Sequence, residues 1–335
     1  MSVSALRVGT AGDQDVEQFT LRSDAGVEVD VLSFGVSVRD WRVPVDSGMR
    51  SVILGLKNVQ DYPEHSPHFG AIAGRVANRI RNASFDLDGA QYPLATPASG
   101  LHLHGGPEGL GLQVWKGEPD SANTAVRFTH FSPDGAMGYP GNVEFTATYS
   151  LSGHTLRLEL AANPDRRTPI SLVQHIYFNL GSGSTVNDHT FRSTASAYTE
   201  LDDSLIATGA ILPVDGTKYD FRQPRRLDDA AGNTDYDINL VLPTSRKFEE
   251  PVFTVVGPDK ALTLDLWTDR PAVQLYNGVT TDVRVPGHAD KTYGKYSGFC
   301  LEDQAFPDAV HNPHFPDIIY GPDRPYRHWC EIRIA

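Results

Sequence analysis

Two short stretches of the sequence place side chains that could transfer protons among apolar residues. In 297–304, SGFCLEDQ, the carboxylate of Glu302 stands at the end of an apolar run. In 171–180, SLVQHIYFNL, His175 is set among large apolar and aromatic residues. Burial raises the pKa of a Glu toward neutrality and His starts near it, so the two are suited to act as base and acid. The residue types favour proton transfer but do not identify a reaction.

Strand alternation assigns these side chains to faces. In three predicted strands one face is apolar, and the other combines polar, aromatic and small residues. The mixed faces are Val173, His175, Tyr177 and Asn179; Gly298, Cys300, Glu302 and Gln304; and Ala272, Gln274 and Tyr276. Such a face suits a pyranose, which needs directional hydrogen bonds for its hydroxyls and a flat apolar surface for its C–H groups. For any single strand, a merely solvated polar face is the commoner explanation, so both interpretations stay open.

Other polar groups have weaker signals. The segment 100–106, GLHLHGG, carries His102 and His104, and a His-x-His pair on a strand could ligate a metal from one face. A third ligand would have to come from elsewhere, and no HExxH motif or cysteine partner is present, so we expect no metal. Asp237 precedes an apolar strand and is, by itself, typical of a turn or capping residue.

The elements that must position these residues are β-strands. Alternating apolar residues in 143–151 and 156–160, around a Ser-Gly turn, predict a hairpin, and 85–94 predicts a second around Asp-Gly. Helical periodicity is nearly absent, and 30 Gly and 23 Pro divide the chain into short pieces. We therefore predict an all-β fold, a large antiparallel β-sandwich forming one domain over 1–335. Function is expected in the loop-like stretches 96–113, 131–142 and 303–325.

Composition excludes several classes of function. The chain of 335 residues is 40% hydrophobic, enough for a large core. It carries 29 basic and 42 acidic residues, a net charge of −13, which argues against nucleic acid or an anionic membrane as a partner. Cys300 and Cys330 show neither CxxC nor zinc spacing, so we expect reduced thiols. Without a secretory signal pattern or an apolar stretch of about 20 residues, a cytoplasmic location is expected.

Several stretches, taken together, resemble the aldose 1-epimerase (galactose mutarotase) family. They run in family order over about residues 20–334. The stretches are GRVANRI (74–80), LHGG followed by VW (103–115), SPDGAMGYPG (132–141), TPISLVQHIYFNL (168–180), YTELDDSLIATGAILPVDGTKYDFRQPRRL (198–227), YDINLVL (236–242), VQLYNG (273–278) and SGFCLEDQAFPDAVHNPHFP (297–316). Eight blocks in order make the resemblance specific.

The resemblance implies a single aldose 1-epimerase domain with a galactose mutarotase-like supersandwich fold, an open sugar cleft on one sheet and no cofactor. It implies exchange of the α and β anomers of a free aldose, so the partner is a small-molecule monosaccharide, and the protein a monomer or weak homodimer. The family's base falls on Glu302 and its acid on His175. Its sugar-binding positions fall on Asn78, Arg79, His104, Asp237 and Gln274. We expect Glu302 ionised and His175 protonated, with Asp237 holding the imidazolium.

Three positions depart from the family's usual pattern. Gln174 stands where Asn is usual, Ile238 where His is usual, and Asp303 where Thr is usual. Gln174 is predicted to face away from His175. Ile238 is expected to remove a sugar hydrogen bond, and Asp303 to add negative charge beside the base. These changes leave the reaction class intact and the preferred aldose open.

Three alternatives accompany this interpretation, the first of which is a mutarotase for another sugar on the same scaffold. A hexose-6-phosphate 1-epimerase should carry a basic cluster at the cleft, and Arg75, Arg79 and Arg81 would share one face if 74–81 were a strand. A non-catalytic sugar-binding protein should lack the base or the acid, whereas this chain has both.

Overall fold

The hairpin predicted from the strongest alternation forms in the computed structural model, which describes residues 1–66, 68–228 and 235–335. Strand β13 (Val143–Ser152) pairs with β14 (Thr155–Pro164), with Leu151 opposite Leu156. Alternate side chains along both strands are buried, because one face packs on the core and the other meets solvent.

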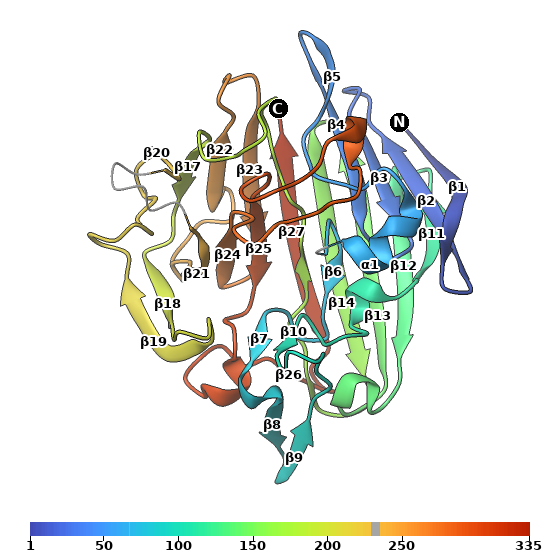
Figure 1. Ribbon diagram of the computed structural model, residues 1–335. Helices are drawn as coiled ribbons and strands as arrows, with labels where there is room; N and C mark the ends of the chain where they lie inside the picture. Colours follow the sequence, from blue (N-terminus) through green and yellow to red (C-terminus); the bar gives the residue numbers. More distant parts are fainter. Residues whose placement is uncertain (67, 229–234) are drawn as a thin grey trace.

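This hairpin lies in a nine-stranded sheet. The other strands, in spatial order around it, are β11 (Lys116–Asp120), β12 (Ala125–Ser132), β27 (Tyr326–Ile334), β23 (Thr263–Thr268), β22 (Phe253–Val256), β17 (Thr190–Ser193) and β20 (Arg225–Arg226). The last strand of the chain, β27, pairs with both β14 and β23, so it joins the two halves of the sheet (Figure 1).

Two five-stranded sheets complete the main architecture. The first is built from consecutive strands: β1 (Ser2–Ala11), β2 (Gln14–Arg22), β3 (Glu28–Leu32), β4 (Val38–Val45) and β5 (Gly48–Ser51). The second runs in the order β19 (Ala207–Pro213), β18 (Ala197–Leu201), β21 (Asp237–Val241), β24 (Ala272–Tyr276) and β25 (Cys300–Gln304). Figure 1 shows the first sheet in blue on the right and the second in yellow to orange-red on the left.

Short elements fill the connections. Two-stranded pairs are formed by β6 (Ile72–Ala73) with β16 (Val173–Gln174), β7 (Arg79–Ile80) with β10 (His102–Leu103), β8 (Ser84–Leu87) with β9 (Ala90–Pro93), and β15 (Thr168–Pro169) with β26 (Ile319–Tyr320). The helices are α1 (Tyr62–His65) and the 3₁₀ turns η1 (Val59–Asp61), η2 (Arg81–Ala83), η3 (Leu110–Leu112), η4 (Ala136–Gly138), η5 (His288–Asp290) and η6 (Ala309–His311). In the described part of the chain, no helix has the length and apolarity needed to cross a membrane.

The hydrophobic core is shared by all three large sheets. One connected cluster contains Phe19 of β2, Phe128 of β12 and Leu240 of β21. The rings of Phe19 and Phe128 meet edge to face with centroids 5.3 Å apart, which fixes the N-terminal sheet against the nine-stranded sheet. The all-β, antiparallel fold class predicted from the sequence is thus confirmed: the pairings between named strands within the described ranges are antiparallel.

One connecting segment joins the two five-stranded sheets. Phe178 makes a bridge to Ile53, which follows the first sheet, and another to Phe299, which precedes β25. The segment around Phe178 therefore runs along the seam between the sheets, with Phe178 pointing into the core. Neighbouring side chains on its other face, including His175, lie over the seam, where they can meet side chains from β25.

Candidate active site

Glu302 lies in the middle of β25, and its side chain is almost completely buried. On the opposite face of the strand, Leu301 packs into the main core and fixes the strand's orientation. On the same face, Gln304 continues the polar row predicted from alternation and donates to Gln274 Oε1 over 3.3 Å. The apolar run before Glu302 thus anchors the strand that carries the carboxylate.

His175 reaches Glu302 from the seam segment. Its Nε2 lies 3.6 Å from Glu302 Oε1. Its backbone is fixed on both sides, because its N–H donates to Ala71 O and its carbonyl accepts from Gly70 N–H. Its Nδ1 lies 3.4 Å from the sulfur of Cys300, a buried and unpaired thiol. The two side chains that the residue types suggested as base and acid therefore lie close together.

Burial disfavours charge on both groups of this pair. Desolvation, reinforced by the nearby Asp237 carboxylate, raises the pKa of Glu302 well above its usual value. Desolvation also lowers the pKa of His175 to about 3. The form with one proton on Glu302 and a neutral imidazole therefore competes with the carboxylate–imidazolium form. Both forms hold the same total number of protons.

A cavity of about 320 Å³ opens above the pair, a volume at the lower end of the range for small-molecule sites. Six of the seven residues predicted from the sequence line it: Asn78, Arg79, His104, His175, Asp237 and Glu302. The seventh, Gln274, is buried beneath the cavity wall and lies opposite Glu302 in the β24–β25 register. The tertiary structure thus brings together segments that are more than 200 residues apart in the sequence.

Asp237 is held by two of the other predicted residues. Arg79 contacts its Oδ2 over 3.3 Å, and Gln274 Nε2 donates to its Oδ1 over 2.6 Å. Both carboxylate oxygens of Asp237 are thus engaged, and the expectation that Asp237 holds the imidazolium of His175 stays a prediction. The charge of Asp237 also acts on Glu302, through the raised pKa described above.

The tautomer of His104 determines whether its ring presents a hydrogen-bond donor or an acceptor to a ligand. The backbone N–H of Asn78 donates to His104 Nδ1 over 3.3 Å, so in the neutral imidazole the proton sits on Nε2. Burial lowers the pKa of His104 well below its usual value, which keeps the ring neutral. His104 therefore presents an N–H donor to a ligand such as a hydroxyl oxygen.

The same tautomer argues against a metal ion. One ligand atom each from His104, His175 and Glu302 lies within 4.8 Å of the others, close enough to suggest a metal site. A metal on His104 Nε2 would force the proton onto Nδ1, where it would face the N–H of Asn78. The donor set fits a neutral polar ligand better than a cation.

His102 does not share the site, although alternation placed it on one face with His104. Strand β10 ends at Leu103, and His104 has a left-handed φ of 51°, which turns its side chain out of the strand pattern. His102 is fully buried elsewhere, between the carbonyl of Ala95 and the hydroxyl of Tyr139.

Aromatic rings form the apolar part of the site. Tyr177 stacks against His175 with ring centroids 5.0 Å apart, and Tyr276 meets Tyr177 edge to face at 6.0 Å. Tyr177 and Tyr276 both line the cavity. The site thus combines hydrogen-bonding groups with flat apolar surfaces, as the mixed strand faces predicted.

Comparison with known proteins agrees with this chemistry. The family model described as aldose 1-epimerase matches residues 17–333. The galactose mutarotase of Rattus norvegicus is 37% identical, with 97% of this chain and 96% of the relative covered. The aldose 1-epimerase of Haemophilus influenzae is 32% identical, with 94% of each covered. The chain belongs to the aldose 1-epimerase family. It is therefore an enzyme of the isomerase class, as the resemblance implied.

Solved structures show the same fold. The GalM/aldose epimerase homologue from C. elegans superposes with a TM-score of 0.89 at 26% identity, covering 94% of this chain and 98% of that one. A galactose 1-epimerase from Lactobacillus acidophilus gives a TM-score of 0.85 at 25% identity, with 100% and 99% covered. The galactose mutarotase-like fold predicted for this epimerase is thereby confirmed.

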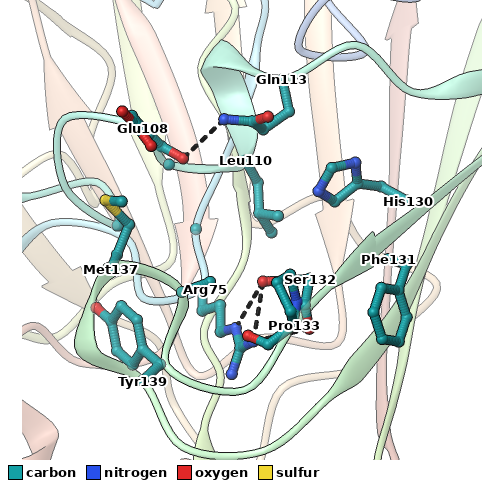
Figure 2. Close-up of a pocket in the computed structure, with 14 residues that line it drawn as sticks. Arg75, Glu108, Leu110, Gln113, His130, Phe131, Ser132, Pro133, Met137 and Tyr139 are labelled. Atoms are coloured by element: carbon teal, nitrogen blue, oxygen red, sulfur yellow. Dashed lines mark hydrogen bonds between the residues drawn. The ribbon is translucent and has the colours of Figure 1, made fainter.

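The basic cluster considered for a phosphate ligand does not form in this epimerase. Arg75 lines a second cavity of about 330 Å³, where it donates to Ser132 and to the carbonyl of Pro133 (Figure 2). It also donates to the carbonyl of Pro140. Arg81 turns toward two other carboxylates, and Arg79 toward Asp237. The shared face depended on 74–81 being a strand, and this condition is not met, because β7 spans two residues and strand alternation does not extend over 75–81.

One family departure does not act as the sequence suggested, and another does. Ile238 is buried in the main core, on the face of β21 away from the cavity, so it removes no contact in the site. Asp303 also faces the interior, where it bonds with His328 Nε2 at 2.5 Å and Thr268 Oγ1 at 2.6 Å, because consecutive residues of a strand point to opposite faces. Its negative charge still contributes to the raised pKa of Glu302, as expected for a carboxylate beside the base.

Sequence reasoning missed several residues that line the cavity. They are His65, His68, Leu103, Leu205 and the loop 279–283. His68 is the most notable, because its ring centroid lies 5.0 Å from that of His104 and 6.0 Å from that of His175. It sits in a loop with a left-handed φ of 62°, where neither strand nor helix periodicity applies.

Proposed function

We propose that this enzyme interconverts the α and β anomers of a free, uncharged aldose, with Glu302 as the base and His175 as the acid. The observation that supports this most directly is the 3.6 Å approach of a buried carboxylate and a buried imidazole in one sugar-sized cavity. Curated relatives are named for galactose, so D-galactose and D-glucose are the first substrates to test.

The proposed reaction begins with a carboxylate on Glu302 and an imidazolium on His175. Glu302 takes the proton of the anomeric O1 hydroxyl, and His175 gives its proton to the ring oxygen. The bond between C1 and the ring oxygen breaks, and C1 becomes an aldehyde. Rotation about C1–C2 presents the other face, the former ring oxygen attacks it as a hydroxyl, and both protons return. Each positioned transfer contributes roughly 10²–10⁴-fold.

Burial favours the direction of the first proton transfers. The closed sugar is bound beside a carboxylate and an imidazolium, which desolvation destabilises. After ring opening, Glu302 is a neutral acid and His175 a neutral imidazole. The environment that raises one pKa and lowers the other thus lowers the energy of the ring-opened state relative to the closed one.

The remaining predicted residues take supporting roles in this proposal. His104 donates from Nε2–H and Arg79 from its guanidinium to sugar hydroxyls, while Asp237 accepts. Asn78 supplies the backbone N–H that sets the His104 tautomer. Gln274 holds Asp237 from beneath the cavity. Such fixed contacts position the ring and supply proximity.

The neutral substrate is favoured over a hexose 6-phosphate. Arg79, the arginine that lines the cavity among the three considered, is paired with Asp237. The described residues that line the cavity therefore include no Arg or Lys without a carboxylate partner to bind a phosphate. A non-catalytic sugar-binding role would not need a buried carboxylate next to an imidazole, since both are costly to charge.

The experiment follows the anomeric ratio of freshly dissolved α-D-galactose, α-D-glucose, L-arabinose and D-xylose by polarimetry or NMR. We expect acceleration by the native enzyme, and its loss in Glu302→Gln and His175→Asn. Glu144→Gln, an exposed position on β13, is the matched control and should keep full activity. If the native enzyme leaves all four sugars at their spontaneous rates, the proposal fails for these substrates; a fully active Glu302→Gln refutes the role of that residue.

A further inference from the structure

We propose that His68 is a third imidazole that binds the sugar, donating a hydrogen bond from Nε2–H to one hydroxyl of the bound aldose. This inference rests on the proposed function, because it assumes that the cavity holds an aldose. It adds a specificity-determining residue that neither the sequence pattern nor the family resemblance supplied.

The position of His68 places it at the centre of the site. It lies in the loop between α1 and β6 and lines the same cavity as Glu302. Its ring is 5.0 Å from that of His104 and is stacked at 27° over that of His175, with centroids 6.0 Å apart. A ligand that touches His104 and His175 is therefore within reach of His68.

The backbone holds His68 in an unfavourable conformation. Its φ of 62° is in the left-handed region, which few residues other than Gly adopt, with Asn, Asp and His the most frequent among them. The turn is fixed by hydrogen bonds from Phe69 N–H to Ser66 Oγ and from Ala71 N–H to His68 O. Gly70, two residues after His68, donates its backbone N–H to His175 O. Sparsely populated conformations held in this way cluster at functional sites.

The ring nitrogens point in different directions. Nδ1 is buried and has no hydrogen-bond partner among the described residues. It faces the backbone of η3, since a Cβ added to Gly111 would lie 3.5 Å from it. This leaves Nε2 as the nitrogen that can reach the cavity. An unsatisfied acceptor is more readily tolerated than an orphaned N–H, so the favoured neutral tautomer carries its proton on Nε2.

The electrostatic surroundings keep that donor neutral. Desolvation lowers the pKa of His68 to about 4, so the ring is uncharged at neutral pH. A neutral N–H matches an uncharged hydroxyl oxygen and adds no repulsion to the imidazolium that His175 must form. The roles of acid and base are already filled, which leaves hydrogen bonding to the sugar for His68.

The alternative is that His68 only packs against its neighbours. A variant that keeps an aromatic ring but lacks the N–H distinguishes packing from hydrogen bonding. His68→Phe keeps the aromatic volume and removes the N–H. His68→Asn, which tolerates a left-handed backbone, serves if the Phe variant does not fold. His154→Phe, in the β13–β14 turn outside the cavity, is the matched control. Thermal unfolding of every variant verifies that the fold is intact.

The measurement compares D-galactose with sugars that each alter one position: 2-deoxy-D-galactose, 3-deoxy-D-galactose, D-glucose, which is inverted at C4, and D-fucose, which lacks the hydroxyl at C6. We expect His68→Phe to lower kcat/KM for D-galactose about fivefold to tenfold, mainly through KM, as for one lost neutral hydrogen bond. For the sugar in which the contacted hydroxyl is missing or inverted, native enzyme and His68→Phe should have the same kcat/KM. An unchanged kcat/KM for D-galactose, or an equal loss for every sugar, overturns the proposal.

Measurements of sugar binding test the role of His68 without relying on catalysis. Titration of the same sugars by calorimetry or ligand-observed NMR should show the same sugar-dependent loss of affinity in His68→Phe. If the native enzyme binds the sugars but accelerates none of them, the proposed function fails while the role of His68 is still measured. If native and variant proteins bind all sugars equally, the role of His68 is refuted.

Discussion

The side-chain amide of Gln174 donates to the carbonyl oxygen of Leu301 over 2.6 Å and so joins the residue before His175 to the residue before Glu302. Its Oε1 accepts from Ile176 N–H over 3.1 Å, so both ends of the amide are used. Gln174 is fully buried and faces away from the cavity, as alternation predicted. The amide is thus a direct link between the segments that carry the proposed acid and base.

Replacement of Gln174 by Leu should weaken catalysis without weakening sugar binding. The change leaves the Leu301 carbonyl and the Ile176 N–H without partners, which destabilises the fold by about 2–4 kcal/mol. Relaxation of the 3.6 Å approach should lower kcat about tenfold, since small displacements cost proximity. KM should stay unchanged, as Gln174 does not line the cavity. Kinetics by polarimetry and thermal unfolding test this, with Gln113→Leu as control; a raised KM at constant kcat would contradict it.

Replacement of Glu302 by Gln should stabilise the fold while removing activity. The folded-state pKa of Glu302 is raised, so its favourable contribution is complete below pH 4.5 and is lost as pH rises through the folded pKa. Gln does not ionise and so avoids this loss. The free energy of unfolding of the variant, relative to that of the native enzyme, should therefore increase by up to about 1.4 kcal/mol for each pH unit in that window. The melting temperature at pH 8 should rise by a few degrees, and the gap should close toward pH 5. A variant that melts earlier at every pH would refute the cause given for the pKa shift.

The buried histidines should make the protein sensitive to mild acid. The folded-state pKa of His175 is about 3 and that of His104 is also depressed, so their stabilising contribution is present above pH 6.5 and is lost as pH falls. Well below pH 6.5, each of these two histidines should lower the free energy of unfolding by about 1.4 kcal/mol per pH unit. Urea unfolding at pH 7, 6 and 5 measures this slope. His175→Asn should make the slope shallower, and an identical slope in both proteins would argue against a neutral buried ring.

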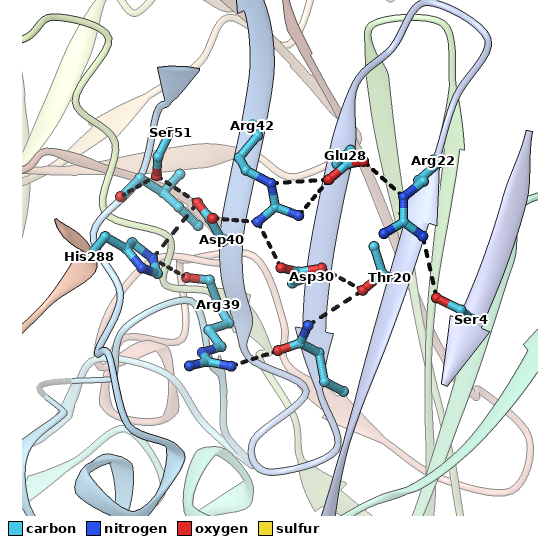
Figure 3. A network of polar contacts seen from close by, with 12 residues as sticks. Ser4, Thr20, Arg22, Glu28, Asp30, Arg39, Asp40, Arg42, Ser51 and His288 are labelled. Atoms are coloured by element: carbon cyan, nitrogen blue, oxygen red, sulfur yellow. Dashed lines mark hydrogen bonds and ion pairs between the residues drawn. The ribbon is translucent and has the colours of Figure 1, made fainter. Parts of the chain in front are cut away.

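A polar network on the N-terminal sheet should contribute measurably to stability. The guanidinium of Arg42 contacts the carboxylates of Glu28 and Asp30 at 2.8 Å and also that of Asp40 (Figure 3). Glu28 lies opposite Arg42 in the β3–β4 register, and Asp30 lies opposite Asp40 two residues further along. The hydrogen bond from Arg42 lowers the pKa of Glu28. Arg42→Met leaves three carboxylates facing one another and should cost about 1–3 kcal/mol.

A solvent-exposed ion pair provides the comparison for Arg42. Arg284 pairs with Asp282, but its side chain is 84% exposed. Arg284→Met should change the free energy of unfolding by less than about 1 kcal/mol. Equal losses in the two variants, measured by urea unfolding, would mean that the network adds nothing to an ordinary surface pair.

Local patterns in the sequence predicted the strands and their faces well. The hairpin at β13–β14 and the Asp-Gly turn between β8 and β9 form where alternation and turn residues indicated. The faces assigned around His175 hold even though its segment is a regular strand only at Val173–Gln174. Period-two alternation survives there because the extended backbone is enough to send successive side chains to opposite sides.

The expectations that failed depend on backbone conformation or on what lies across a strand. His102 and His104 separate because His104 adopts a left-handed φ, and His68 was missed for a similar reason. Ile238 was expected to affect sugar binding because it follows Asp237 in the chain, but adjacent strand residues face opposite layers. Such features carry no periodic signal that sequence reasoning can detect.

The sequence by itself therefore determined the all-β class, the faces of the strands and, through eight ordered motifs, the enzyme family. The tertiary structure decided which polar side chains meet. It brings His175 to 3.6 Å from Glu302 and places Arg79 and Gln274 in contact with Asp237. It also places the ring of His68 beside those of His104 and His175. These contacts join segments far apart in the chain, and they exist because packing of the apolar faces fixes where the opposite faces point.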